Sequence, residues 1–131
     1  VVADPKAGSL LGPGLKEQPP TLFALLIGID KYLNPQYRLQ GAVKDAKEME
    51  DYLSTSFPSA QIRSLHDEAA TRKSIIREID RLIQNPSIKR QDPILIFYAG
   101  HGGETTPPNG WTSHNGKVQM LMPQDYDEDS T

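Results

Sequence analysis

A run of apolar and aromatic residues that ends in a glycine-rich turn constrains this chain more than any other feature. Residues 93–103 read PILIFYAGHGG, and no charged side chain occurs between Ile94 and Tyr98. Such a run is typical of a strand that is buried on both faces of a parallel sheet. Pro93 marks its start, because proline cannot donate to a hydrogen-bonded ladder. We therefore expect a parallel β-sheet with this strand in its core.

The turn that follows the strand holds the best candidate for a catalytic residue. His101 lies between Gly100 and Gly102, and glycines allow a tight turn with positive φ and little bulk beside the imidazole. The carboxyl end of a parallel strand is where α/β proteins bind ligands. An imidazole titrates near neutrality, so His101 can accept and return a proton, with the N–H of Gly102 exposed beside it. The alternative is a glycine-rich turn that contains a histidine by chance.

The rest of the chain alternates predicted strands and helices. Along the chain we expect a buried strand over 22–29, a helix over 41–55, a weaker strand near an edge over 61–65, a helix from Thr71 to Asn85, the strand after Pro93, a long loop over 100–116, and a last strand over 118–122. Thr71 is a helix cap, because its side chain can accept from first-turn N–H groups. This order predicts right-handed crossovers and an α/β fold, a three-layer sandwich with a mostly parallel sheet.

Apolar residues at helical spacing predict the inner faces of both helices. These residues are Ala42, Ala46, Met49 and Leu53 in the first helix, and Ile75, Ile79, Leu82 and Ile83 in the second. Residues 1–20 contain four prolines and no periodicity, so we expect a flexible lead-in there and a domain over 21–131. The chain ends at Thr131 without a closing element, which favours a segment of a longer protein.

Composition excludes several classes of function. The net charge is −3, which gives no indication of nucleic acid or an anionic membrane as a partner. No apolar run approaches the ~20 residues that cross a bilayer, and residues 1–20 do not resemble a signal peptide. The absence of cysteine rules out a disulfide scaffold and weakly favours a cytoplasmic location.

Metal and phosphate sites have little support in the sequence, so we expect no metal ligands. The three histidines lack the spacing of a zinc site. The acidic residues between Asp125 and Asp129 lack the pattern of a calcium loop, and residues 100–103 lack the Lys-Ser/Thr of a phosphate loop. We expect His66 and His114 to lie at the surface.

Two carboxylates are further candidates for the site. Asp45 lies on the first predicted helix, where an exposed carboxylate without a function is the alternative. Asp30 follows the first strand and either faces the same crevice as His101 or caps a loop.

Three segments together resemble the caspase–metacaspase superfamily of cysteine peptidases. They read LFALLIGIDKY, GAVKDA and DPILIFYAGHGG, and the resemblance runs from about Leu22 to Tyr126. The last segment is the most specific, and the whole is most similar to fungal caspase-domain proteins. The resemblance implies a caspase-like fold that is incomplete at its C-terminus. It also implies a cytoplasmic thiol protease of the kind involved in apoptosis, with proteins and peptides as substrates.

The resemblance further implies a Cys–His dyad and a role for five residues of this chain. His101 matches the general base and acid, and Gly102 matches the glycine whose N–H stabilises the oxyanion. Asp45 matches a carboxylate that lines the first specificity pocket, where it would favour Arg or Lys through charge-assisted hydrogen bonds. Ala42 and Ala99 occupy pocket positions where metacaspases often have Cys and Ser.

The chain departs from the family in lacking the nucleophile, which belongs to a later strand. This segment alone is therefore expected to be inactive, and its partner would be the remaining segment that carries the cysteine. Calcium stays open as a cofactor of the full-length protein. Two other interpretations stay open as well: a non-catalytic caspase-like module that binds regulatory partners, and a receiver-like signalling domain, which would not explain the glycine-flanked His101.

Overall fold

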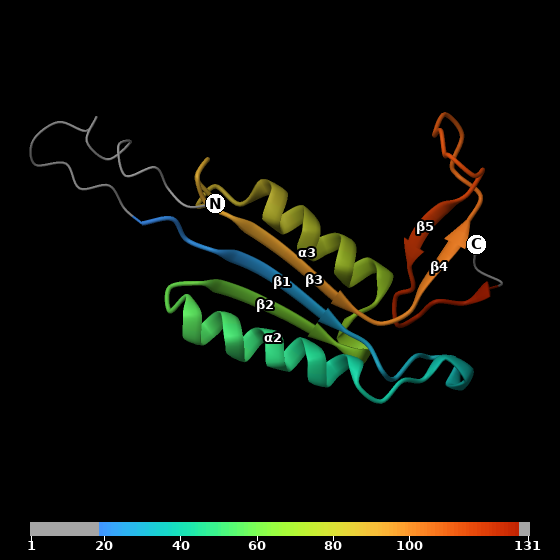
Figure 1. The fold of residues 1–131 in the computed structure, drawn as a ribbon, viewed down its shortest axis with the longest axis horizontal. Helices are drawn as coiled ribbons and strands as arrows, with labels where there is room; N and C mark the ends of the chain where they lie inside the picture. The colour runs from blue at the N-terminus through green and yellow to red at the C-terminus, as the bar shows by residue number, and fades with distance from the viewer. Residues whose placement is uncertain (1–18, 129–131) are drawn as a thin grey trace, which may run out of the picture.

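A parallel sheet with one helix on each face forms the centre of the computed structural model, which describes residues 19–128 (Figure 1). The sheet has three strands in the order β2-β1-β3, with β1 at Phe23–Gly28, β2 at Gln61–His66 and β3 at Ile94–Ala99. Helix α2 (Ala42–Ser56) covers one face and helix α3 (Arg72–Gln84) covers the other. The predicted three-layer α/β fold is confirmed.

The three strands end at the same level. Gly28, the last residue of β1, lies opposite His66 of β2 and Ala99 of β3. Because all three strands are parallel, their carboxyl ends form one end of the sheet. The loops that follow β1 and β3 therefore meet there, and His101 lies in this region.

β1 is the buried centre of the sheet, and β3 is less buried than the sequence predicts. Every residue of β1 is buried, whereas Ile94 and Ile96 of β3 are 51% and 49% exposed. The expectation that this strand is buried on both faces is therefore wrong for the described residues. Leu95 and Phe97 pack beneath α2, which leaves Ile94 and Ile96 on the α3 face. Helix α3 packs against β1 and contacts β2 through the Glu78–Arg63 pair, so it leaves these two side chains half exposed.

The helices agree with the sequence prediction except for one side of α3. α2 begins and ends within a residue of the expected bounds, and its predicted apolar face packs on the sheet. Thr71 caps α3 by accepting from the N–H of Ser74 at 3.2 Å. Ile83, expected on the inner face, is 75% exposed. Glu78 takes an inner position instead, where it pairs with Arg63 of β2 and with Arg81.

The segment after His101 contains a strand that the sequence did not predict. β4 (Gly102–Thr105) pairs antiparallel with β5 (Val118–Leu121), the last strand expected. Glycines disfavour strands, which hides β4 in the sequence. The ribbon stands apart from the main sheet, beyond the carboxyl end of β3 (Figure 1).

Two short 3-10 helices lie in the loops, at Pro35–Tyr37 and at Asp67–Ala69. The predicted lead-in over residues 1–20 falls almost wholly outside the described residues. None of the helices within residues 19–128 is long and apolar enough to cross a membrane.

Candidate active site

The main chain of His101 is fixed by hydrogen bonds from three separate segments. Its N–H donates to the hydroxyl of Tyr32 at 2.8 Å. Its carbonyl oxygen accepts from the hydroxyl of Tyr98 at 2.7 Å and from the N–H of Met122 at 3.0 Å. The turn after β3 is therefore held by the loop after β1, by β3 itself and by the residue that follows β5.

The imidazole of His101 has a defined hydrogen-bond partner. Its Nε2 lies 2.8 Å from the main-chain oxygen of Tyr37. A carbonyl oxygen only accepts, so Nε2 carries the hydrogen, and Nδ1 of the neutral ring is unprotonated. Nδ1 is thus the atom that can act as a base. The ring is half-buried and packs against Tyr32 and Tyr37, with centroid distances of 5.2 and 6.0 Å.

Sequence reasoning missed Tyr37, because a main-chain acceptor leaves no signature in the side-chain pattern. The Tyr37 hydroxyl donates to the carboxylate of Glu128. This hydrogen bond is the main cause that raises the pKa of Tyr37 to about 12, so the hydroxyl stays protonated. Its ring also contacts Tyr126 edge-on, with centroids 6.0 Å apart. The loop after β1 and the segment after β5 are thereby joined beside His101.

Gly100 is required for space, and the expected positive φ does not occur in this turn. A Cβ at Gly100 would lie 2.7 Å from the hydroxyl oxygen of Tyr98 and 2.8 Å from that of Tyr32. The glycines with positive φ in the described part of the chain are Gly110 and Gly116. Burial, followed by the hydrogen bond to Tyr32, raises the pKa of Tyr98, so this hydroxyl also remains a donor.

The N–H of Gly102 points away from its paired strand. Gly102 lies opposite Leu121 in the ladder. The neighbouring residues His101 and Met122 form a hydrogen-bonded pair, because the Met122 N–H donates to the His101 oxygen. Hydrogen-bonded and non-hydrogen-bonded pairs alternate in an antiparallel ladder, so Gly102 and Leu121 form a non-hydrogen-bonded pair. A main-chain donor is therefore directed outward, one residue after the imidazole.

The predicted pocket residues gather at the same end of the sheet. A Cβ at Gly28 would lie 2.8 Å from Cβ of Ala46 and 3.0 Å from the Ala42 oxygen, so α2 starts directly against the end of β1. Ala99, in register with Gly28, lies on the same face of the sheet as α2. Asp45 is in the first turn of α2. Its side chain is exposed, and the role in a specificity pocket that the resemblance implies stays a prediction.

Asp30 caps helix α2, whereas the sequence predicted either a place in the crevice beside His101 or a loop cap. Its carboxylate oxygens accept from the N–H groups of Ala42 at 2.8 Å and Val43 at 3.1 Å. Asp67, which has a φ of 50°, in turn accepts from the N–H groups of Asp30 and Lys31, both at 2.9 Å. These bonds anchor the loop that carries Tyr32 and Tyr37. Asp30 therefore holds the start of α2, the helix that carries Asp45.

The other two histidines differ from each other. His114 is exposed, as expected, but His66 is half-buried, and its Nε2 is buried without a hydrogen-bond partner. Within residues 19–128, no group of three His, Cys, Asp or Glu side chains lies close enough to hold a metal ion.

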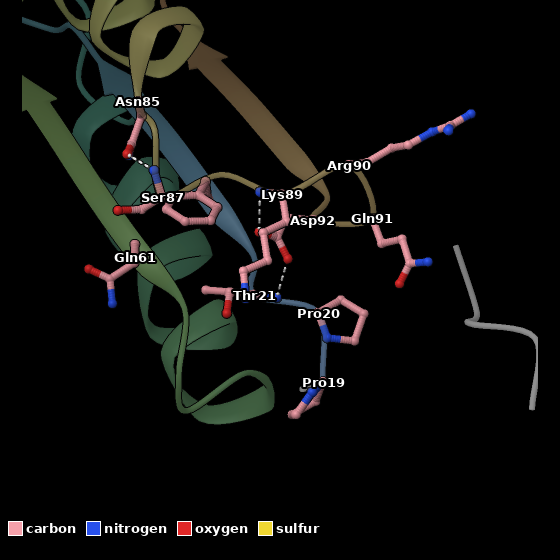
Figure 2. Close-up of a pocket in the computed structure, with 11 residues that line it drawn as sticks. Pro19, Pro20, Thr21, Gln61, Asn85, Ser87, Lys89, Arg90, Gln91 and Asp92 are labelled. Carbon is pink, nitrogen blue, oxygen red and sulfur yellow. Dashed lines mark hydrogen bonds between the residues drawn. The ribbon is translucent and has the colours of Figure 1, made fainter. Parts of the chain in front are cut away.

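A cleft of about 760 Å³ lies at the opposite end of the sheet. Pro20, Phe23, Gln61 and Lys89 are among its lining residues, and Arg90 points outward from it (Figure 2). The carboxylate of Asp92, also in this cleft, accepts from the N–H groups of Thr21 at 2.9 Å and Lys89 at 2.7 Å. These residues surround the amino ends of the strands, so the cleft is not part of the His101 site.

Comparison with known proteins identifies similar sequences and similar folds. Residues 23–131 match a family model described as metacaspase, peptidase C14 domain. Metacaspase-1A of Aspergillus oryzae is 32% identical over 111 residues, which cover 79% of this chain and 26% of that protein. Metacaspase-1 of Eremothecium gossypii is 30% identical over 112 residues, which cover 79% of this chain and 24% of that protein.

Among solved structures, protein GSU0716 of Geobacter sulfurreducens has a similar fold. The TM-score is 0.64 at 22% sequence identity, and the match covers 81% of this chain and 40% of that chain. This likeness concerns the fold alone. The chain spans about a quarter of the length of the two metacaspases above.

Proposed function

Because this chain belongs to the metacaspase family of peptidases, peptidase C14, we propose that it is the amino-terminal part of a cysteine endopeptidase. In this proposal His101 is the general base and acid, and the nucleophilic cysteine comes from a later part of the full-length protein. One observation carries the proposal: His101 lies at the carboxyl end of the sheet with Nε2 bound to the Tyr37 oxygen. This arrangement leaves Nδ1 unprotonated and available to a thiol.

The proposed reaction uses groups on two sides of the substrate carbonyl. Nδ1 of His101 accepts the thiol proton, and the thiolate attacks the scissile carbonyl carbon. The N–H of Gly102 then donates to the oxygen that becomes negatively charged. As the carbon–nitrogen bond breaks, the imidazolium returns its proton to the leaving amine. Water hydrolyses the remaining thioester and releases the acid.

The uncovered side of β3 supports a contribution from a later segment. Within the described residues β3 pairs with a neighbour on one side only, because the sheet order is β2-β1-β3. Ile94 and Ile96 are about half exposed beside that edge. A further parallel strand there would bury both side chains and end level with Ala99, near the imidazole. The nucleophile would then arrive on the strand next to His101.

We propose cleavage after Arg or Lys, with Asp45 as the residue that selects the cation. Its carboxylate lies in the first turn of α2, at the same end of the sheet as His101. Ala42 and Ala99 would supply small walls beside it. Asp45 is exposed here, so in the proposed enzyme the later segment closes the pocket and strengthens the charge pairing.

A non-catalytic module that binds protein partners is the second candidate. The chain contains no cysteine, which agrees with this candidate and with a peptidase whose nucleophile lies in a later segment. The two candidates differ in the residue that the full-length protein carries at the nucleophile position. A later buried strand that ends in a cysteine favours the peptidase, and a replaced cysteine favours the binding module.

The test uses the full-length protein and fluorogenic peptides that end in Arg, Lys or Asp before the reporter. We expect cleavage of the Arg and Lys peptides, and a loss of about 10³-fold or more in kcat/KM for His101→Ala. His114→Ala is the matched control, because His114 is exposed in the loop between β4 and β5. An unchanged rate in a folded His101→Ala variant rules out the proposed role.

A further inference from the structure

We propose that Tyr32 is a positioning residue for His101, an inference that rests on the proposed peptidase function. Tyr32 is 1% exposed. Its hydroxyl oxygen lies 2.8 Å from the His101 nitrogen, 3.0 Å from the Met122 oxygen and 3.2 Å from the Tyr98 hydroxyl oxygen. One buried hydroxyl thus joins the end of β3, the segment after β5 and the turn that carries the imidazole.

The Tyr32 hydroxyl has one hydrogen and two acceptors within reach. These are the Met122 oxygen and the Tyr98 hydroxyl oxygen, which itself lies 2.8 Å from the Met122 oxygen. The Tyr32 oxygen then accepts the N–H of His101. Without the hydroxyl, this N–H would stay in a partly buried position and lose its acceptor, which is unfavourable. The turn would shift to find another partner, and the imidazole would move with it.

Tyr32 positions the imidazole indirectly, by holding the main chain of His101. The loop that carries Tyr32 also contacts the imidazole ring directly. The same loop carries Tyr37, whose main-chain oxygen accepts from Nε2 of His101. The loop is itself anchored, because the Leu33 N–H donates to the Gln124 oxygen at 3.0 Å, and Asp67 holds its first residues. One loop therefore fixes the backbone of His101 and the direction of its ring. Loss of the bond to the Tyr32 hydroxyl or of the bond to the Tyr37 oxygen would lower the fraction of molecules in which Nδ1 points toward the thiol.

Tyr32→Phe isolates the hydroxyl, because phenylalanine keeps the ring that packs against the imidazole. The first experiment measures amide hydrogen exchange in the full-length protein. We expect the His101 amide to exchange about tenfold faster or more in Tyr32→Phe, while the amide of Leu26 in β1 changes less than about twofold. Tyr52→Phe is the control, because Tyr52 is 62% exposed on α2. Unchanged exchange at His101 overturns the proposal, because the hydroxyl would then not hold the turn. An equal increase at Leu26 also overturns it, because the hydroxyl would then stabilise the whole fold and not the turn in particular.

The second experiment measures catalysis by the full-length protein. We expect Tyr32→Phe to lower kcat about tenfold or more with KM within about twofold of the wild type, since positioning affects the transition state more than substrate binding. An unchanged kcat overturns the positioning role. If the wild-type protein cleaves no peptide, the peptidase proposal fails, and the exchange result alone decides whether Tyr32 holds the turn.

Discussion

The carboxylate of Asp30 holds the start of α2 through the main chain of Ala42, with 2.8 Å between Oδ1 and the Ala42 nitrogen. The second oxygen accepts from the N–H of Val43 at 3.1 Å. A residue after β1 thus caps the next helix, which places the first turn of α2 over the end of the sheet. The positions of Ala42 and Asp45 depend on this cap.

Removing the cap should destabilise the protein measurably. We expect Asp30→Ala to lower the free energy of unfolding by about 1–2 kcal/mol, because two first-turn N–H groups lose their acceptor. Urea denaturation followed by circular dichroism measures the change. Asp51→Ala is the control, because Asp51 is exposed within α2 and should change stability by less than about 0.5 kcal/mol. Equal effects of the two substitutions would contradict the capping role.

Gly100 should tolerate no side chain. We expect Gly100→Ala to cost about 1–3 kcal/mol, because the new Cβ would press on two tyrosine hydroxyls that hold His101. Gly41→Ala offers a matched comparison, since no atom lies within 4 Å of the Cβ that it would introduce. Thermal or urea unfolding of both variants measures the difference. A Gly100→Ala variant as stable as Gly41→Ala would show that the turn has room to move.

Removing only the two arginines that pair with Glu78 should destabilise the protein more than removing Glu78 together with them. The Glu78 side chain is 8% exposed, whereas those of Arg63 and Arg81 are 61% and 62% exposed. Replacing both arginines with Met leaves a buried carboxylate without a cation, and we expect a loss of about 2 kcal/mol. Adding Glu78→Met to that double variant should restore most of the loss, because the uncompensated charge is removed. Unfolding free energies of the double and triple variants test this, and a triple variant less stable than the double would contradict it.

Asp92 should contribute to the acid sensitivity of the fold. The N–H of Lys89, followed by that of Thr21, lowers the pKa of this carboxyl group in the folded state. A lowered folded pKa means that the stabilisation is complete above the unfolded pKa of about 4 and is lost as pH falls through the folded pKa. We therefore expect the stability difference between wild type and Asp92→Asn to shrink between about pH 5 and pH 2. Urea midpoints at several pH values measure it, and a difference independent of pH would exclude this contribution.

The strand and helix order could be predicted because it rests on local patterns. The apolar runs ending at Gly28 and Ala99 and the cap at Thr71 are each visible in a few consecutive residues. The exposure of Ile94 was not predictable in this way, because it depends on which elements lie beside β3. β4 was missed because its two glycines resemble a loop.

The site was predicted in part, and the missing part has a physical reason. His101 and Gly102 stand out because an imidazole among glycines follows an apolar strand. The Tyr37 contact uses a main-chain oxygen, so no side-chain type reveals it. Tyr32 and Tyr98 were hidden because their rings look like core residues, and only the fold brings their hydroxyls to the turn.

The tautomer of His101 is the measurement that tests the central claim most directly. Long-range ¹H–¹⁵N NMR of the neutral imidazole reports which nitrogen carries the hydrogen. The contact with the Tyr37 oxygen predicts hydrogen on Nε2 and an unprotonated Nδ1. A hydrogen on Nδ1, or rapid exchange between the two tautomers, would contradict an imidazole held ready to serve a thiol.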